Sequence, residues 1–282
     1  MRVLTSIATM NEQGDGEYQA LVDVLGNAQV TEHLHEIQAG DVVFPRFRAI
    51  PFGDLLQKGV EHAGAELINS FHQHRNIADS ATWSHLLDGS DGNDALSPKQ
   101  YGIDDIRHLP EGEWFVKGET NSLKNQWLNA TFAPSTRDLG RVVSNFMADS
   151  YVGSQSVVIK PFQHYRKLAT GVNGAPVFHE RRAFILDGKV VSDGFYWSNW
   201  KEEVGEIEYD KFQYLNTLDE AARRVQHLAR FLVIDLAEYP DGSWGVVELN
   251  DGCMSGLSDN DPRVLWANVK EAMSKPSRPY LI

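Results

Sequence analysis

Residues 231–252 read FLVIDLAEYPDGSWGVVELNDG, and the interpretation of the chain starts from this stretch. Two runs with the composition of β-strands flank Asp241 and Gly242, the dipeptide best suited to a two-residue type I′ turn. If these two residues form the loop, counting outward along both strands places Asp235 directly opposite Glu248 on one face. The stretch therefore predicts a hairpin that holds two carboxylates side by side.

Carboxylates this close repel each other, so a sequence that specifies them usually supplies a cation between them. Mg²⁺ suits this position because it prefers oxygen ligands and retains waters for nucleotide phosphates. Asn250, on the same face, adds an amide oxygen, and the single cysteine, Cys253, excludes a thiolate cluster. Two interpretations stay open: a magnesium site at Asp235, Glu248 and Asn250, or solvent-facing carboxylates on a hairpin whose register is shifted by one residue.

A second Asp-Gly turn lies within ERRAFILDGKVVSDGFYW, residues 180–197. Counting outward from Asp187 and Gly188 predicts that Arg182 faces Asp193. An arginine in a strand with buried neighbours needs an anion, which is either Asp193 or a ligand phosphate in a cleft. From the residues alone, we favour the ion pair within the hairpin.

Two lysines stand at the ends of strand-like runs. Lys117 closes the run WFVK and is followed by GETNSLK, a turn rich in small hydrogen-bond donors that suits phosphate oxygens. Lys160 closes the apolar run SVVIK. Each lysine taken alone is more simply explained as a strand end that reaches solvent, so a functional role depends on the rest of the pattern.

The composition of the whole chain excludes several classes of protein. Its 282 residues are 42% hydrophobic and carry a net charge of -13, which repels nucleic acid phosphates, so direct nucleic acid binding is not expected. No apolar run reaches the length of a membrane span and no leader layout is present, so we expect a cytoplasmic protein without a membrane partner. The P-loop, protein-kinase and GxSxG motifs are absent from the sequence.

Two regions differ in their pattern. The first third alternates strand-like and helical segments, at 3–7, 18–25, 42–47, 55–63 and 65–68, which predicts a small α/β layer. A polar, glycine-rich stretch, LLDGSDGNDALSP, then predicts a boundary between an N-terminal domain, 1–97, and a second domain, 98–282. The second domain is predicted to be α+β, with strands at 114–117, 157–162, 182–186 and 189–197 and helices at 138–150 and 218–232.

Together these segments resemble the ATP-grasp superfamily, whose members bind ATP between two α+β lobes and mostly join a carboxylate to an amine. The resemblance also reaches the first domain, where FPRFRAIPF and GAELINSFHQHRNIADSATW are similar to an uncharacterised bacterial and phage branch. The segments that carry it in the second domain are FVKGETNSLKNQW for the lysine strand and phosphate loop, VVIKPF for the strand beside the adenine, ERRAFILDGKVV for the next hairpin and IDLAEYPDGSWGVVELNDG for the magnesium strands.

The resemblance implies a fold class of α+β with two ATP-binding lobes behind a small α/β N-terminal domain. It implies ATP and Mg²⁺ as cofactors, and small-molecule or peptide carboxylates and amines as substrates. The implied activity is ligation through an acyl phosphate. A phosphotransferase and a non-catalytic nucleotide-binding module are the alternatives.

Carried over residue by residue, the family's site falls on named positions of this chain. The resemblance implies that Arg182 contacts the γ-phosphate or the acyl phosphate. Glu180 or the loop 163–174 stands where the family places an acidic contact to the ribose. The remaining expected contacts are Lys117, Thr120, Asn121 and Ser122 with the phosphates, Lys160 with the adenine side or α-phosphate, and Asp235, Glu248 and Asn250 with magnesium.

Other candidates have only a weak signal in the sequence. Arg46, Arg48 and Arg75 are candidate anchors for a substrate carboxylate, and a surface salt bridge explains each of them equally well. The histidine pairs His33/His35 and His72/His74 lack metal-ligand spacing to carboxylates and are interpreted as surface or structural residues. Cys253 is interpreted as a packing residue.

Overall fold

The hairpin at 231–252 supplies an inner strand and an edge strand of a four-stranded antiparallel sheet, called the large sheet below. In the computed structural model, which describes residues 1–275 apart from the side chains at positions 12, 13 and 51, β12 (Phe231–Glu238) pairs antiparallel with β13 (Trp244–Asp251). On its other side β12 pairs with β10 (Glu180–Leu186), and β11 (Lys189–Phe195) completes the order β11-β10-β12-β13.

The predicted pairing of Asp235 with Glu248 is confirmed, although the turn differs from the prediction. The Tyr239 N–H donates to the Ser243 carbonyl at 2.7 Å, so the loop holds three residues and ends in Gly242 with φ +85. This turn shifts the register by one residue relative to a two-residue loop. A β-bulge in β13 shifts the register back before the carboxylates are reached.

The second hairpin has the predicted two-residue turn, with positive φ at both Asp187 and Gly188. A bulge follows it, and the register beyond the bulge is shifted. The predicted pairing of Arg182 with Asp193 is therefore wrong, because the ion pair with Asp193 is made by Arg181.

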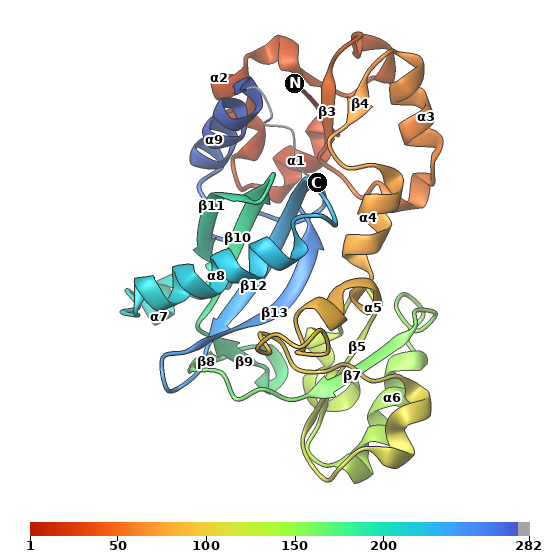
Figure 1. Ribbon diagram of the computed structural model, residues 1–282, viewed down its shortest axis with the longest axis vertical. Coiled ribbons are helices and arrows are strands. Elements are labelled where there is room, and N and C mark those ends of the chain that lie inside the picture. Colours follow the sequence, from red (N-terminus) through yellow and green to blue (C-terminus); the bar gives the residue numbers. More distant parts are fainter. Residues whose placement is uncertain (276–282) are drawn as a thin grey trace.

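Both faces of the large sheet are covered, which explains why every residue of β12 is buried (Figure 1). Helix α8 (Lys211–Val225) packs on one face, where Ile234 and Leu236 contribute to its core. The other face, with Phe231 and Val233, packs against α9 (Pro262–Ser274) and the N-terminal sheet. Because side chains alternate along a strand, Asp235 lies on the face of Phe231 and Val233.

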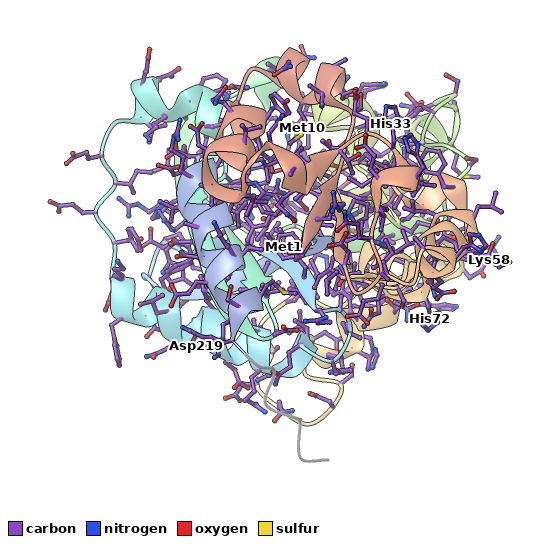
Figure 2. All side chains as sticks on the ribbon, turned by 90° about the horizontal axis from the view of Figure 1, so that it is seen from above. Met1, Met10, His33, Lys58, His72 and Asp219 are labelled. Atoms are coloured by element: carbon purple, nitrogen blue, oxygen red, sulfur yellow. The ribbon has the colours of Figure 1, made fainter. Side chains whose placement is uncertain are left out.

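The N-terminal region forms the predicted α/β layer, with a parallel sheet in the order β2-β1-β3-β4. Figure 2 places Lys58 and His72 at the rim of this region and Met1 and Met10 toward the middle of the molecule. Its elements are β1 (Arg2–Leu4), α1 (Ile7–Gln13), α2 (Glu17–Leu25), β2 (Val30–Thr31), β3 (Val42–Pro45), α3 (Leu55–His62), β4 (Glu66–Leu67), α4 (Phe71–Ala78) and α5 (Ser80–Trp83).

A smaller lobe lies at the opposite end of the molecule (Figure 1). Its antiparallel sheet has the order β6-β5-β7, and the hairpin β8-β9 connects it to the large sheet. The elements of these segments are β5 (Trp114–Gly118), β6 (Phe132–Ala133), α6 (Leu139–Met147), β7 (Val157–Pro161), β8 (Lys167–Thr170) and β9 (Pro176–Phe178), and the short helix α7 (Lys201–Val204) follows β11.

Two of the predicted helices have different limits in the structure. The helix predicted at 138–150 is α6, which ends three residues earlier at Met147. The helix predicted at 218–232 begins at Lys211, because the Asp210 side chain accepts hydrogen bonds from the first backbone N–H groups, and it ends at Val225. The sequence pattern extended the helix into β12, whose continuous apolar residues also fit a helical stripe.

Within residues 1–275 no helix has both the length and the apolar character needed to cross a bilayer. The division into 1–97 and 98–282 stays a proposal, and the end of that second range, 276–282, lies outside the described residues. One core joins the two ranges, since Phe44 of β3 packs edge-to-face against Trp266 of α9, with ring centroids 6.0 Å apart.

Candidate active site

A cavity between the small lobe and the large sheet has mainly apolar walls. Phe115 of β5 and Phe178 of β9 contribute aromatic surface, and Val247 of the β13 bulge lies opposite them. The charged side chains in its lining are Lys124, Lys160 and Glu180. A flat heterocycle suits such walls, because aromatic side chains stack on it while a few polar groups fix its orientation.

Lys160 contributes to the lining of this cavity and is buried, whereas the strand pattern alone favoured a side chain that reaches solvent. Its Nζ donates to the Val247 carbonyl at 2.8 Å and lies 5.6 Å from the ring centroid of Phe115. The bulge that restores the hairpin register therefore also supplies a hydrogen-bond acceptor. Burial, together with the nearby positive charge of Lys117, lowers the pKa of Lys160 to about 8.

Lys117 and Glu248 form an ion pair between the small lobe and the large sheet. Lys117 is 4% exposed and points from β5 toward β13. Burial alone would raise the pKa of Glu248, but the Lys117 ammonium lowers it to about 2. The pair thus places a fixed cation and a fixed anion at the mouth between the lobes.

Arg182 and Asp235 form a second, more deeply buried pair. The guanidinium donates to both carboxylate oxygens, with Nε to Oδ1 at 2.9 Å and Nη2 to Oδ2 at 2.8 Å. Nη1 donates to the Gly256 carbonyl at 3.0 Å, and the group lies 4.7 Å from the ring centroid of Tyr196. Because Asp235 is directly opposite Glu248, the two pairs are neighbours.

The predicted magnesium ligands come together on one face of the hairpin. Asn250 Nδ2 lies 3.3 Å from Asp235 Oδ2, and Asp235 is opposite Glu248. Hard oxygen donors of this kind fit Mg²⁺. The carboxylates are balanced here by Arg182 and Lys117, so a divalent ion would compete with these two side chains for the same oxygens. The donor set fits the ion, and the assignment stays a proposal.

The predicted phosphate loop follows β5 and is held by its own contacts. The Gly118 N–H donates to the Asn121 carbonyl at 2.7 Å, which closes the turn. Both the backbone N–H and the hydroxyl of Thr120 donate to Gln155 Oε1, at 3.0 and 3.1 Å. Ser122 lies in the same loop, partly buried. Gln155 thus uses both donors of Thr120, and a phosphate contact by this loop stays a proposal.

Glu180 is 3% exposed in the cavity wall, where its Oε2 accepts a hydrogen bond from Trp197 Nε1 at 3.0 Å. Burial raises the pKa of Glu180 to about 7, and the charge of Lys124 opposes part of that rise. A buried carboxyl group in a cavity whose pKa is raised in this way is a candidate functional position. Its contact with a ribose stays a proposal.

Lys124 is a residue that the sequence analysis missed. Its Nζ lies 4.7 Å from the ring centroid of Tyr196 and 4.9 Å from that of Trp197, inside the cavity. Burial lowers its pKa, but the Tyr196 phenol and the Glu180 carboxylate outweigh that effect and raise the pKa above the ordinary value. Its position in GETNSLK, close to the predicted phosphate contacts Thr120 and Ser122, was the feature of the sequence that could have identified it.

The three candidate carboxylate anchors lie in different environments. Arg46 binds Glu17 through two hydrogen bonds, at 2.9 and 2.8 Å, and donates to the carbonyls of residues 252, 253 and 255. The guanidinium of Arg46 therefore donates its hydrogen bonds to groups of the protein itself, and Arg46 is not a substrate anchor. Arg75 is exposed on α4, and Arg48 donates to the Tyr151 hydroxyl at 2.7 Å.

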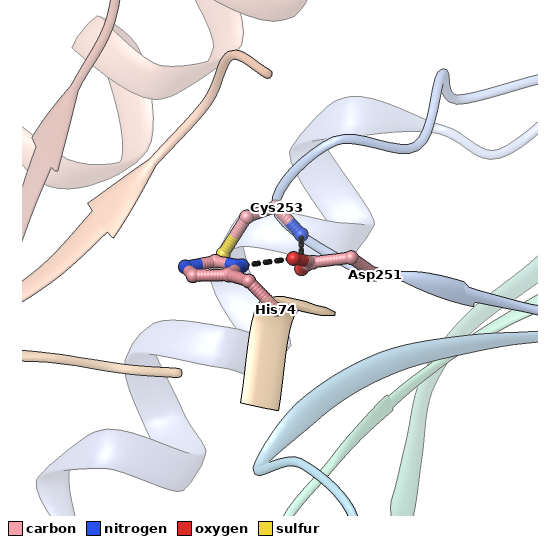
Figure 3. Close-up of side chains that lie close together, drawn as sticks. All are labelled: His74, Asp251 and Cys253. Carbon is pink, nitrogen blue, oxygen red and sulfur yellow. Dashed lines mark hydrogen bonds and ion pairs between the residues drawn. The ribbon is translucent and has the colours of Figure 1, made fainter. Parts of the chain in front are cut away.

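His74, Asp251 and Cys253 form a buried cluster where α4 meets the end of β13 (Figure 3). The His74 ring contacts the Asp251 carboxylate through Nδ1, and Asp251 also accepts from the Cys253 N–H at 2.8 Å. Among the described residues this is the only group of three His, Cys, Asp or Glu side chains with ligand atoms within 4.8 Å of one another. The direct hydrogen bond joins the N-terminal region to β13, and Cys253 belongs to the surrounding core.

Two lobes, each built on an antiparallel sheet and separated by a cavity that contains lysines, define a protein with the ATP-grasp fold. The family model "ATP-grasp domain, R2K clade family 3" matches residues 100–269, and the chain belongs to this family. The predicted fold class is thus confirmed. None of the curated proteins matches the sequence.

Solved structures share the fold over nearly the whole chain. D-cycloserine synthetase DcsG is 15% identical with a TM-score of 0.62, covering 96% of this chain and 98% of its own. The ATP-grasp ligase PsnB, complexed with the precursor peptide PsnA2 and AMPPNP, is 14% identical with a TM-score of 0.58 and coverages of 97% and 96%. D-alanine–D-alanine ligase from Bacillus anthracis, complexed with ATP, is 13% identical with a TM-score of 0.59 and coverages of 96% and 91%. At these identities the likeness shows the fold.

Proposed function

We propose that this protein is an ATP- and magnesium-dependent ligase that joins a carboxylate to an amine through an acyl phosphate. The proposal depends on one observation. Lys117 and Arg182, from different lobes, are each paired with one of two carboxylates that stand opposite each other on β12 and β13. Fixed cations beside fixed oxygen ligands, next to an aromatic cavity, suit the phosphates and the base of ATP respectively.

The reaction has two balanced steps. A carboxylate oxygen of the substrate attacks the γ-phosphorus and the bond to the β–γ bridging oxygen breaks, which gives an acyl phosphate and ADP. The amine then attacks the acyl carbon, phosphate leaves, and a proton is released as the amide forms. Arg182 and Lys117 donate hydrogen bonds to the transferred phosphoryl oxygens, and Lys160 binds a phosphate further toward the base.

Asp235, Glu248 and Asn250 would hold magnesium, which supplies charge neutralisation for the phosphates. Lys117 and Arg182, which pair with two of these carboxylates, would then be available to contact the nucleotide. In this reaction the substrate carboxylate and the amine are the nucleophiles, so no side chain has to form a covalent intermediate. The names of the structures that share the fold, which include two ligases and a synthetase, support the same reaction class.

The test is a balance of products. The purified protein is incubated with ATP, magnesium and mixtures of amino acids or peptides, and ADP and inorganic phosphate are measured separately. A ligase releases both in equal amounts, and only when acid and amine are present together. Release of ADP without phosphate would instead establish a phosphotransferase, and nucleotide binding without turnover would establish a non-catalytic module.

Variants connect the activity to the site. Lys117→Met and Glu248→Gln are expected to lower turnover by about a hundredfold or more, since each removes a charge that faces the reacting phosphate. Glu202→Gln, a change at an exposed position on α7, is the matched control and leaves turnover unchanged. Wild-type turnover in either site variant would contradict the assignment.

A further inference from the structure

A second cavity, of about 500 Å³, lies at the carboxyl edge of the N-terminal sheet. Thr5 and Ser6 follow β1, Glu32 follows β2, and Phe47 and Arg48 follow β3. The order β2-β1-β3-β4 makes β1 and β3 the point where the chain crosses from one side of the sheet to the other. Crevices at such a point, beyond the carboxyl ends of parallel strands, are where open α/β sheets bind ligands.

The walls of this cavity are apolar and open to solvent. Phe52 is 54% exposed, Leu55 72% and Leu34 41%, although each is large and hydrophobic. Phe47 packs edge-to-face against Phe52, with ring centroids 5.7 Å apart, so the aromatic wall has a fixed shape. An exposed apolar surface of this kind, gathered in one concavity, indicates a binding site.

Two opposite charges stand in the same lining. Within residues 1–275, Arg48 forms no ion pair with a carboxylate, and it donates a hydrogen bond to the Tyr151 hydroxyl at 2.7 Å. Glu32 accepts the Ile7 N–H through Oε1 at 2.8 Å, which orients the carboxylate and leaves Oε2 for another partner. A guanidinium and a carboxylate beside apolar walls are complementary to a zwitterion with an apolar side chain.

The cavity adjoins the ATP-binding lobe. Tyr151, which accepts the hydrogen bond from Arg48, belongs to the segment between α6 and β7. Gln155 of the same segment accepts both hydrogen bonds from Thr120 in the predicted phosphate loop. Arg48 in the cavity lining is therefore connected, through one short segment, to the predicted phosphate loop.

We propose that this cavity is a substrate subsite for an amino acid with a bulky apolar side chain, whose carboxylate binds Arg48 and whose ammonium binds Glu32. The side chain packs on Phe52 and Leu55. The proposal rests on the ligase function proposed above and names its substrate class, because a ligase of this type needs an acid and an amine, and an amino acid supplies both groups.

The test measures binding directly, so that it does not depend on turnover. Isothermal titration calorimetry is carried out on the full chain with the L- and D-forms of phenylalanine, leucine, alanine and aspartate, with AMPPNP and magnesium present. We expect phenylalanine or leucine of one configuration to bind at least about tenfold more tightly than alanine or aspartate. Phenylalaninamide, which lacks the carboxylate, is expected to bind as weakly as alanine.

Matched variants place the binding in the cavity. Arg48→Gln is expected to weaken binding of the preferred amino acid by about ten- to a hundredfold, the loss of a charged hydrogen-bonded pair. Phe52→Ala is expected to reduce the preference for it over alanine by about tenfold. Arg107→Gln and Phe212→Ala are the controls, because both positions are exposed and lie outside the cavity lining. Melting temperatures of all four variants verify folding.

Three outcomes would overturn the subsite. The first is equal binding of apolar and acidic amino acids, the second is no binding of either, and the third is unchanged affinity in both Arg48→Gln and Phe52→Ala. AMPPNP binding, titrated separately, distinguishes these outcomes from a failure of the proposed function. A protein that binds the nucleotide but no amino acid would retain the ATP site and lose this subsite. A protein that binds phenylalanine without releasing ADP would retain the subsite and lose the ligase assignment.

Discussion

Lys160 gives the site a pH dependence that can be calculated from the structure. The side chain is 9% exposed, and its pKa is lowered to about 8 by burial and by Lys117. In the free protein about nine-tenths of the molecules carry the charge at pH 7, and about one-tenth at pH 9. If only the charged form binds the nucleotide phosphate, the affinity for ATP falls about tenfold between pH 7 and pH 9.

Nucleotide binding is also expected to change the protonation of Lys160. A bound phosphate raises the pKa of Lys160 again, so nucleotide binding takes up a proton from solution. At pH 8, where half of the free protein is charged, uptake of about half a proton for each nucleotide is expected. Calorimetric titration with AMPPNP in buffers of different ionisation enthalpy measures this number.

A conservative variant isolates the residue. Lys160→Arg keeps its charge throughout this pH range, so its affinity is expected to stay constant where that of the wild-type protein falls. Glu180 also titrates in the cavity, at about 7, and repeating the series in Glu180→Gln separates its contribution. An affinity that is flat from pH 7 to pH 9, or a pH dependence that persists in Lys160→Arg, would refute the reasoning.

Three further outcomes are expected. Glu180→Gln is expected to stabilise the fold by on the order of 1–3 kcal/mol at pH 8 and to have no effect near pH 4, because the raised pKa of Glu180 destabilises the folded state only at pH values above the pKa of this group in the unfolded chain. Thermal melts at both pH values measure the difference, and equal gains at the two would contradict it. Arg182→Met lowers the free energy of unfolding in urea by about 3–5 kcal/mol, because it leaves Asp235 buried and unpaired. Adding Asp235→Leu is expected to recover most of this loss, and a double variant no more stable than Arg182→Met would contradict the coupling of the pair. Arg46→Gln lowers stability by a similar amount, about 3–5 kcal/mol, and leaves the KM for the carboxylate substrate unchanged. A raised KM for that substrate in a protein of normal melting temperature would restore Arg46 as a substrate anchor.

The hairpin at 231–252 shows how a local prediction succeeds and where it stops. The pairing of Asp235 with Glu248 was predicted from a two-residue turn, but the turn has three residues and a bulge at Val247 compensates. The second hairpin has the predicted turn, and there an uncompensated bulge moves Asp193 from Arg182 to Arg181. Alternation of side chains fixes the register only between bulges, and a bulge depends on what the strand packs against.

Of the lysines in the site, the sequence predicted two and missed one. Lys117 and Lys160 were selected from strand ends, whereas Lys124 was missed because it begins a three-residue 3-10 helix, which is too short to give a periodic pattern. The partners were missed as well: the Val247 carbonyl that binds Lys160 and the Asp235 carboxylate that binds Arg182. These contacts join residues far apart in the chain, so the periodicity of side chains along a helix or strand cannot predict them.

The sequence by itself determined that 180–197 and 231–252 form hairpins at Asp-Gly turns, that Lys117 and Lys160 lie on strands, and the family resemblance, because turn residues and side-chain periodicity act over a few neighbouring positions. The facing of Asp235 and Glu248 was predicted too, but a bulge at Val247 is what restores it. Only the tertiary structure decided which cation meets which carboxylate, that Arg46 joins Glu17 instead of a ligand, and that Arg48 faces an open apolar cavity. The strength of these contacts depends on distance in space, and that distance is set by how the N-terminal region and the two lobes pack against one another.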